Sequence, residues 1–489
     1  MKAILANLGF VLQTAGLIIL LAIPMAIIYN EQSPLISFLI TSIVFLVSGF
    51  LLNAFSQRKE LDYKSSCILI TIVFFLLGLI GSIPYLYTNI FADSSVISKV
   101  VNSFFESVSG FSTTGLSMIT NVDALPRSIV FYRGLTQWVG GISIVFIFVA
   151  FFYSDKVLDN LSRAIGAEKL TTSLRKSFSS VLLIYTVYTA IFILLFYFLG
   201  LKSWVTNISL VFSTISTGSF SPVTNFSTLV AYPYNVVLIV LMIIGGISFS
   251  VHFSLFTGKL KRILSGELLA FFLIIGVFTI GFSLLTKFNL ATSLFHVTSA
   301  SSTTGFSFID MGSLAANAKV LLIILMFVGG SAFSTAGGVK IFRIMVFIKS
   351  IPWAVKGITT GNLEVLKFGG REMKHADIIS AWLMIILAVS IIFIFAFIFT
   401  LYGFPLVDSV FELTSAFATA GLSVGITSIG LAIGLKIILA LFMLLGRIEL
   451  ISFLIAILPE TKKKEKVNSY EIPVQKNEAE VKIPNREEI

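Results

Sequence analysis

Four short clusters of serine, threonine and glycine are the part of this chain best suited to bind an ion. Each cluster ends a moderately apolar stretch that is too short to cross a membrane, at 102–117, 209–220, 293–307 and 409–423. When the clusters are aligned on one glycine each, the preceding residues are small and mostly hydroxylated. The aligned ligand positions, which we expect to act mainly through backbone carbonyls, are Ser112, Thr113, Thr114, Gly115, Ile215, Ser216, Thr217, Gly218, Ser302, Thr303, Thr304, Gly305, Ala418, Thr419, Ala420 and Gly421.

The chemistry expected of these clusters is cation binding. A half-helix that enters from outside directs its C-terminal end, which carries a partial negative charge, toward the middle of the membrane. Glycine lets the following backbone adopt conformations closed to other residues. Four such turns around one axis make a ring of carbonyl oxygens that can replace the water shell of a cation. The alternative is that the small residues only allow close helix packing, but four copies at equivalent places favour an ion filter.

The elements that must hold these clusters are membrane helices. The chain has 489 residues, of which 56% are apolar and only 12% are charged, whereas soluble proteins carry about 25% charged residues. We therefore expect an integral membrane protein, and each span needs about 20 apolar residues. The long spans that the sequence predicts cover about 5–29, 34–55, 66–88, 129–153, 176–200, 232–256, 266–286, 318–350, 377–402 and 429–459.

The distribution of basic residues predicts that both termini are cytoplasmic. With alternating spans, most of the 34 Lys and Arg residues fall on the side of the N-terminus, as the positive-inside rule requires. The net charge of +10 is therefore explained without a nucleic-acid partner. The basic residues expected on the outer side are Lys99, Arg127, Arg133, Lys202, Lys287, Lys319 and Lys436.

Each cluster belongs to a larger repeat of span, half-helix, turn and span. The predicted fold class is an all-α polytopic membrane protein, with four such repeats around one central pore and two additional N-terminal spans. It would contain about ten long membrane helices and four half-helices. The predicted boundaries are 1–60 for the additional spans, 61–165, 166–262, 263–375 and 376–459 for repeats one to four, and 460–489 for a charged cytoplasmic tail.

An arginine near mid-membrane predicts a barrier on the cytoplasmic side of the filter. Arg447 lies about 16 Å below Lys436 along a helix. Its counterparts in the other repeats are glycines, which suggests a position on the crowded pore axis, and these counterparts are Gly141, Gly246 and Gly330. The alternative is a structural ion pair, for instance with Glu449.

A glycine-rich segment predicts a break in the eighth span. The segment GGSAFSTAGG covers 329–338, and each glycine weakens a helix by up to ~1 kcal/mol. We expect Gly329, Gly330, Gly337 and Gly338 to form an irregular loop that lines the cavity below the filter and gates it. The alternative is a tight helix-packing surface.

Three polar residues occupy one place in three of the half-helices. Glu106, His296 and Glu412 each lie nine residues before the reference glycine. We expect the two glutamates to hydrogen-bond within the protein and brace the half-helices; the alternative is that they concentrate cations at the outer mouth. Glu267 and Asp408 are interpreted as interface residues with no special role.

The sequence resembles the Trk/Ktr/HKT superfamily of potassium transporters, and its two additional leading spans make it most similar to the bacterial TrkH/TrkG branch. The resemblance covers about residues 1–460, and its most specific motifs are SGFSTTG (109–115), SSTTGFS (301–307), GGSAFSTAGGVKIFRI (329–344) and GRIEL (446–450). It implies a homodimer in the bacterial inner membrane, in contact with lipid, and a cytosolic ring of nucleotide-binding (RCK, TrkA-like) regulatory subunits. It implies potassium as the transported ligand and no organic cofactor. In this family, serine at the first reference position accompanies sodium preference, so Gly115 implies potassium.

The predicted function is potassium uptake through a four-repeat filter, gated by the loop and the arginine. Sodium conduction or cation–proton symport by the same architecture remains an alternative, and the sequence leaves open whether flux is channel-like or coupled. A polytopic membrane enzyme is the alternative from another class. It is disfavoured because the sequence has no HExxH motif and no phosphate-binding loop. The one cysteine, Cys67, and the three scattered histidines, His252, His296 and His375, also disfavour a metal cluster.

Overall fold

The computed structural model describes residues 2–54, 61–92, 95–142, 174–258, 266–361, 365–368, 371–373 and 375–459, and these are mostly helical. The N-terminal helices are α1 (Lys2–Ile19), η1 (Leu20–Ala22), α2 (Ile23–Ile28) and α3 (Gln32–Ala54). They are followed by α4 (Tyr63–Ile80), α5 (Ile83–Tyr87), α6 (Val96–Phe111), α7 (Arg127–Ile142), α10 (Leu174–Phe198), α11 (Trp204–Ile215), η2 (Phe226–Leu229), α12 (Tyr234–Gly246) and α13 (Phe249–Phe256). The remaining elements are α14 (Gly266–Thr286), α15 (Leu290–Ser301), α16 (Ala316–Val328), α17 (Ile341–Thr360), β1 (Lys367–Phe368), β2 (Arg371–Glu372), α18 (His375–Leu401), α19 (Leu406–Phe417), α20 (Ile433–Ile448) and α21 (Leu450–Ile457).

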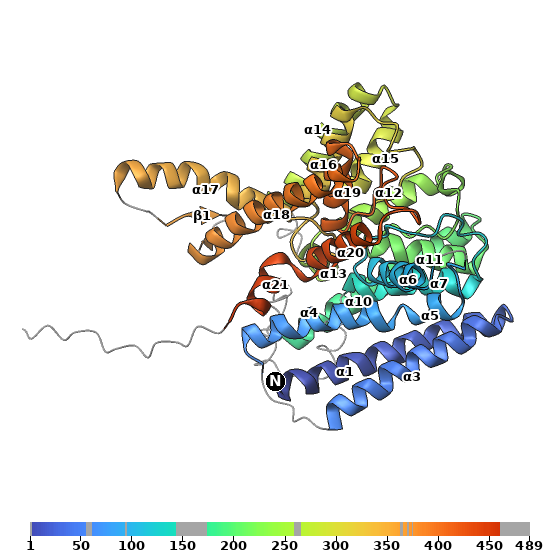
Figure 1. Cartoon of the computed structure of the whole chain (residues 1–489). Helices are drawn as coiled ribbons and strands as arrows, with labels where there is room; N and C mark the ends of the chain where they lie inside the picture. Colours follow the sequence, from blue (N-terminus) through green and yellow to red (C-terminus); the bar gives the residue numbers. More distant parts are fainter. Residues whose placement is uncertain are drawn as a thin grey trace, which may run out of the picture. The chain divides into compact units, whose positions relative to one another are not determined.

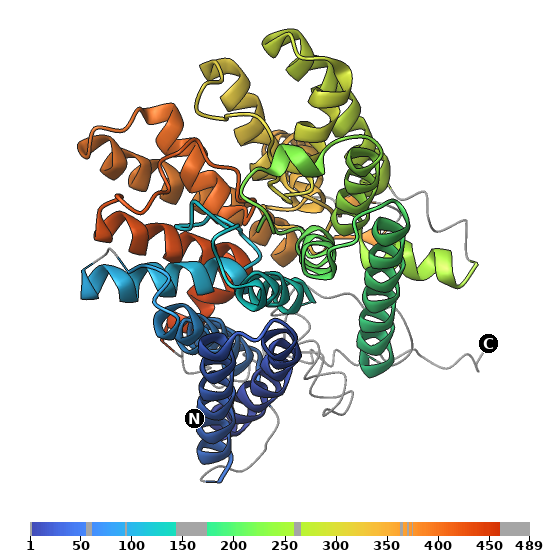
Figure 2. The same cartoon turned by 90° about the vertical axis from the view of Figure 1, so that its right-hand side faces the viewer.

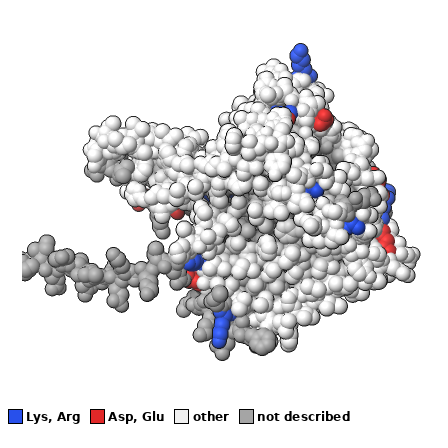
Figure 3. Space-filling model, in the orientation of Figure 1, with Lys and Arg blue, Asp and Glu red and all other residues white. Residues whose placement is uncertain are grey.

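Long apolar helices dominate this fold (Figure 1). Six of the described helices are long and apolar enough to cross a membrane, or up to eight if each of two sharply bent pairs is one span. Of the other two predicted spans, 129–153 extends past Ile142 and so lies partly outside the described residues, and 318–350 is broken between α16 and α17. Figure 3 shows a surface with few charged side chains, as contact with lipid requires. The predicted all-α membrane fold is confirmed.

The same order of long helix, short helix, turn and second helix occurs four times. The units are α4–α6–α7, α10–α11–α12, α14–α15–α16 and α18–α19–α20. The short helices α11, α15 and α19 have 12 residues each, or about 18 Å, which is too short to span the bilayer. Side chains of Ser95, Ser203 and Asn289 cap the N-termini of α6, α11 and α15 by accepting a backbone N–H, which fixes where these helices begin.

The four units close into a ring. The second long helix of each unit packs on the short helix of the next: α7 on α11, α12 on α15, α16 on α19, and α20 back on α6. The last contact brings the fourth repeat beside the first, and Figure 2 shows the red helices of the fourth repeat next to the light-blue α6 region. The ring order gives the four short helices one common centre. The residue boundaries between the repeats stay predictions.

Two buried lysines join neighbouring units of the ring. Lys319 Nζ lies 2.7 Å from Asp408 Oδ1, and Lys436 Nζ lies 2.7 Å from Asn102 Oδ1. Both lysines stand eleven residues before the position of Arg447 in their own repeat, so the two contacts are equivalent. The prediction that these lysines lie on the outer side of the membrane stays a prediction. The prediction that Asp408 has no special role is wrong, because Asp408 pairs with Lys319. A buried charge needs such a partner because its removal from water is unfavourable.

The two additional N-terminal spans form a hairpin beside the first repeat. α1 and α3 pack closely because Gly9 and Gly49 face each other; a methyl group on Gly9 would lie 2.5 Å from the carbonyl oxygen of Gly49. Between these spans, the carboxylate of Glu31 accepts the backbone N–H groups of Arg127 and Ser128 at 2.6 and 2.9 Å. These are free N–H groups at the start of α7, so the hairpin is fastened to the first repeat.

Candidate cation filter and inner cavity

The four short helices end in turns with the same backbone conformation. Two residues after each helix ends, a threonine has a left-handed φ of between 49 and 60°; these residues are Thr113, Thr217, Thr303 and Thr419. That conformation is uncommon for a β-branched residue. It is held because each threonine N–H bonds back to a helix carbonyl, as from Thr113 to Gly110 at 3.0 Å. The turns therefore direct successive carbonyls away from the helix path.

The register of the second turn differs from the sequence alignment by one residue. Two residues after the left-handed threonine stand Gly115, Gly305 and Gly421, with φ of 87, 77 and 85°. In the second repeat, the residue two positions after the left-handed threonine is Ser219, so Gly218 is equivalent to Thr114 of the first repeat. The predicted ligand set Ile215–Gly218 therefore shifts to 216–219, and the prediction of four equivalent glycines is wrong. Hydrogen bonds fix this register, because Gly218 N bonds Ser213 O as Thr114 N bonds Ser109 O.

The four turns converge. A methyl group added to Gly305 would overlap the carbonyl oxygen of Ala420, and one added to Gly421 would overlap that of Thr114. One added to Gly115 would overlap the hydroxyl of Ser219. The third turn thus contacts the fourth, the fourth contacts the first, and the first contacts the second. Glycine is required at these three positions because any side chain would overlap the neighbouring turn. The structure brings together the predicted residues of all four clusters, with the second in its corrected register.

Two hydroxyl groups at the turns have no protein partner. Within the described residues, the buried Oγ1 atoms of Thr113 and Thr419 form no hydrogen bond. The equivalent hydroxyl of Thr217 donates to Ser216 O at 2.7 Å, and that of Thr303 accepts the N–H of Gly337 at 2.6 Å. A buried hydroxyl without a partner is unfavourable by about 1–3 kcal/mol. The arrangement therefore offers oxygen atoms to a bound ion.

The polar residues inside the half-helices brace the segments that follow the turns. Each accepts a backbone N–H twelve residues further along the chain. The bonds join Glu106 to Met118, His296 to Phe308 and Glu412 to Val424, at 3.1, 3.5 and 3.1 Å. The prediction that the two glutamates brace the half-helices is confirmed, and their burial argues against the alternative role at an exposed mouth.

Arg133 is a buried residue beside the turns whose contacts the sequence analysis missed. It is only 2% exposed, and its Nε donates to Glu106 at 3.0 Å. Its guanidinium also donates to Ser221 O at 3.2 Å and lies 4.1 Å from the centre of the Phe220 ring. Arg133 thus ties the first turn to the second. The signal that could have found it is an arginine inside the apolar span 129–153.

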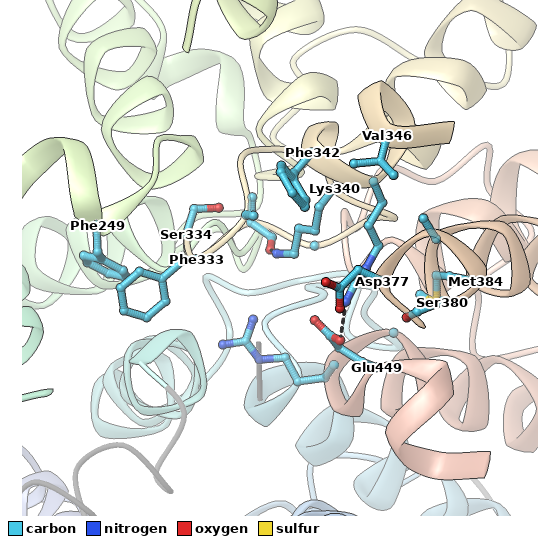
Figure 4. Close-up of a pocket in the computed structure, with 18 of the residues that line it drawn as sticks. Phe249, Phe333, Ser334, Lys340, Phe342, Val346, Asp377, Ser380, Met384 and Glu449 are labelled. Carbon is cyan, nitrogen blue, oxygen red and sulfur yellow. Dashed lines mark hydrogen bonds and ion pairs between the residues drawn. The ribbon is translucent and has the colours of Figure 1, made fainter. Parts of the chain in front are cut away.

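A cavity of about 510 Å³ adjoins the turns on the side of the half-helix C-termini. Residues of α4, α17, α18 and α20 and of the segment between α16 and α17 line it. Its charged lining residues are Lys340, Arg343, Glu372, Asp377, Arg447 and Glu449. Figure 4 shows Lys340, Asp377 and Glu449 directed toward the same hollow. Arg343 and Glu449 form an ion pair at 2.6 Å, so part of this charge is neutralised.

The predicted break in the eighth span is present. α16 ends at Val328 and the helix resumes with α17 at Ile341. The loop folds back on itself, because a methyl group on Gly329 would overlap the carbonyl oxygen of Gly337 and one on Gly330 would lie 2.5 Å from Ala336 Cβ. Gly329 and Gly338 have φ of 70 and 74°, where glycine is favoured.

This loop, residues 329–340, is fastened to the second repeat and to the first long helix of the third. The hydroxyl of Thr335 donates to Ile215 O at 3.1 Å and to Gly245 O at 2.9 Å. The N–H of Ala332 donates to Glu267 at 2.6 Å. The prediction that Glu267 has no special role is wrong, because its carboxylate holds the loop. Its partner is 65 residues away in the sequence, so no local pattern could have shown the contact.

Arg447 crosses the cavity and holds the loop against the first repeat. Its guanidinium donates to Thr335 O at 3.1 Å, to Gly141 O at 2.8 Å and to Gly140 O. The alternative ion pair with Glu449 is not formed, because Glu449 binds Arg343.

Two of the glycines that align with Arg447 lie against the turns of neighbouring repeats. A methyl group on Gly141 would lie 2.5 Å from Ser216 Cβ, and one on Gly246 would lie 3.2 Å from Ser302 Cβ. These glycines permit packing on the turn of the next repeat. At the equivalent position, Arg447 has a long side chain that lines the cavity.

Comparisons with known proteins agree with this geometry. The family model described as "TrkH: Cation transport protein" matches residues 34–291 and 287–466. The chain is 31% identical over 465 residues to an uncharacterized cation transporter of Methanocaldococcus jannaschii, covering 93% of this chain and 94% of the relative. It is 28% identical over 494 residues to the Trk system potassium uptake protein TrkH of Vibrio parahaemolyticus, covering 94% and 98%. The crystal structure of the potassium transporter TrkH from V. parahaemolyticus superposes with a TM-score of 0.81 at 24% identity, covering 94% of this chain and 98% of that chain.

A ring of four half-helices inside apolar spans, with converging carbonyl turns, defines a membrane transport protein for cations rather than an enzyme. The chain belongs to the TrkH family of cation transport proteins.

Proposed function

We propose that this chain takes up potassium ions through its four converging turns. The observation that carries the proposal is the shared left-handed threonine at the C-terminal end of each half-helix, because it gives four turns that contact one another the same backbone conformation. The partial negative charges of four helix ends favour a cation there and disfavour an anion. The names of several relatives, which are potassium uptake proteins, support the choice of potassium.

In this mechanism the filter residues act as ligands and the loop and arginine act as the barrier. An ion exchanges its water for carbonyl oxygens of the turns, and the hydroxyls of Thr113 and Thr419 supply further oxygen atoms. It then meets the loop 329–340 and the positive charge of Arg447, both of which line the cavity. Opening requires Thr335 to release Ile215 and Gly245, and the guanidinium to move aside. Once past this point the ion enters a cavity with acidic residues, among them Asp377.

We further propose a homodimer in the cytoplasmic membrane, with both termini in the cytoplasm and a cytosolic nucleotide-binding regulatory ring as partner. The positive-inside distribution of Lys and Arg supports the orientation. The regulatory partner is supported by the Trk system in which relatives are named. Reporter fusions at each terminus test the orientation, and the mass of the purified detergent complex, with and without the co-expressed partner, tests the assembly.

The function is tested by rubidium uptake into cells that lack their own potassium uptake systems. We expect expression of the chain to give saturable rubidium uptake that excess potassium suppresses strongly and excess sodium suppresses less. Uptake no greater than in cells with an empty vector, with the protein shown to be in the membrane, would contradict the proposal.

A further inference from the structure

The second turn lacks the hydrogen bond that braces the other three. In those repeats, the residue seven positions before the left-handed threonine accepts the backbone N–H five positions after it, as Glu106 does from Met118 at 3.1 Å. In the second repeat these two positions hold Leu210 and Pro222. The leucine side chain has no acceptor and proline has no backbone N–H. The segment that follows the second turn therefore needs a different support.

A glutamine of the first repeat holds this segment. Gln137 is buried in α7, which packs on the half-helix α11, and its Oε1 accepts the N–H of Phe220 at 3.2 Å. The contact is close, because a methyl group on Gly218 would lie 2.5 Å from Gln137 Cδ. One helical turn earlier, Arg133 donates to Ser221 O at 3.2 Å. The first repeat thus supplies the brace that the second repeat cannot make for itself.

The position of Gln137 in the repeat is polar only in the first unit. The equivalent residues, four before the positions aligned with Arg447, are Met242, Met326 and Met443. Their helices, α12, α16 and α20, pack on α15, α19 and α6, which are the three half-helices with their own brace. The glutamine therefore stands beside the one turn that lacks a brace.

The bond to Gln137 sets the direction of one carbonyl of the candidate filter. The peptide group between Ser219 and Phe220 is trans, so its N–H and its carbonyl oxygen point in opposite directions. Because Gln137 holds the N–H toward α7, the carbonyl of Ser219 is held pointing away from α7. This carbonyl belongs to the ligand set 216–219 of the second turn, and the number and strength of such dipoles decide how a filter binds an ion.

We propose that Gln137 is a positioning residue for cation binding, which holds the second turn in its ligand geometry from the neighbouring repeat. The inference rests on the proposed function of the four turns as a cation filter. Gln137 acts on the ion through the peptide group of Phe220. Within the described residues its Nε2 forms no hydrogen bond, so the acceptor oxygen is the atom that provides the support.

The experiment measures rubidium, potassium and sodium influx through the purified full-length chain in liposomes, per reconstituted molecule. Gln137→Met removes the acceptor and keeps nearly the same volume, with the residue type that the other repeats have at this position. We expect it to raise the KM for rubidium about fivefold, which corresponds to about 1 kcal/mol, as for the loss of one buried hydrogen bond. The potassium-to-sodium flux ratio should fall as well, because the second turn no longer holds its carbonyl in place.

Two further variants make the result specific. Gln13→Met is the matched control, because Gln13 accepts the side-chain amide of Asn53 at 3.3 Å in the N-terminal hairpin; it should leave both the KM and the flux ratio unchanged. Gln137→Asn keeps the amide but draws it back by one methylene, so it should act in the same direction as Gln137→Met. It tests the same hydrogen bond where the methionine variant is not recovered from the membrane.

The outcomes separate this inference from the proposed function. If wild type conducts potassium and the KM and flux ratio are the same in wild type, Gln137→Met and Gln137→Asn, Gln137 does not position the filter, although the filter assignment stands. If Gln13→Met changes both quantities as much as Gln137→Met does, the effect is not specific to the second turn and the inference is wrong. If wild type conducts no cation above the level of protein-free liposomes, the proposed function fails and the inference with it.

Discussion

Replacing Arg447 by alanine should raise cation flux strongly. The guanidinium lies in the cavity that adjoins the turns, and its hydrogen bonds reach Thr335 O at 3.1 Å and Gly141 O at 2.8 Å. A fixed charge ~5 Å from a passing ion gives about 3 kcal/mol of repulsion at an effective dielectric constant of 20. If this repulsion appears fully in the barrier, its removal raises the rate roughly a hundredfold. The same substitution also frees the loop, because the bond to Thr335 is lost.

The assay is rubidium flux into liposomes, normalised to the amount of correctly sized protein. Arg447→Gln should behave like Arg447→Ala, since it removes the charge, and Arg447→Lys should keep most of the restriction. Lys202→Gln is a suitable control, because it also removes one positive charge, from a residue whose Nζ lies 4.0 Å from the centre of the Tyr197 ring and which does not line the cavity. Equal flux per molecule in wild type and Arg447→Ala would refute the barrier, and would leave Arg447 a structural link between the fourth repeat and the first.

Three further substitutions test the filter, the loop and the brace. Gly115→Ser should reduce the potassium flux and the potassium-to-sodium flux ratio, because the φ of Gly115 is 87° and the new side chain would overlap Ser219. An unchanged flux ratio in ion-competition assays would exclude this turn from the filter. Thr335→Val should raise basal rubidium flux several-fold, since it removes the hydroxyl that the carbonyls of Ile215 and Gly245 share, a hydrogen bond worth about 1 kcal/mol. Flux equal to wild type would show that this hydroxyl does not hold the gate. Arg133→Met should destabilise the protein by about 3–5 kcal/mol, because it leaves the Glu106 carboxylate buried without its ion pair. In thermal-unfolding measurements, adding Glu106→Gln should recover part of this loss, and no recovery in the double variant would argue against the pair.

The helices and their fourfold order could be predicted because each depends on a local pattern. Apolar length predicts a span and a short apolar stretch ending in small residues predicts a half-helix, and both are found. The loop 329–340 was also predictable, since glycine density weakens a helix locally. The segment 143–173, in which the span 129–153 was expected to end, lies outside the described residues.

The register of the second turn could not be predicted from residue types alone. Aligning on glycine assumes that only glycine adopts a left-handed φ, yet threonine does so in all four turns, held there by a hydrogen bond to the helix end. The contacts of Arg133, Glu267 and Lys436 were missed for another reason. The contacts of Arg133 and Lys436 join different repeats, and the contact of Glu267 joins two parts of the third repeat that are 65 residues apart. These distances in the sequence give no sign of how the fold brings the residues together.

The central claim, that the four turns bind potassium, is tested most directly by anomalous diffraction from crystals of this chain grown in rubidium or thallium salts. The account predicts anomalous density on the common axis of the turns, within ligand distance of the carbonyls at Thr113, Thr217, Thr303 and Thr419. It predicts that sodium or choline in place of the heavy ion removes that density. Well-diffracting crystals with no density between the turns, or with density only at other sites, would contradict the claim.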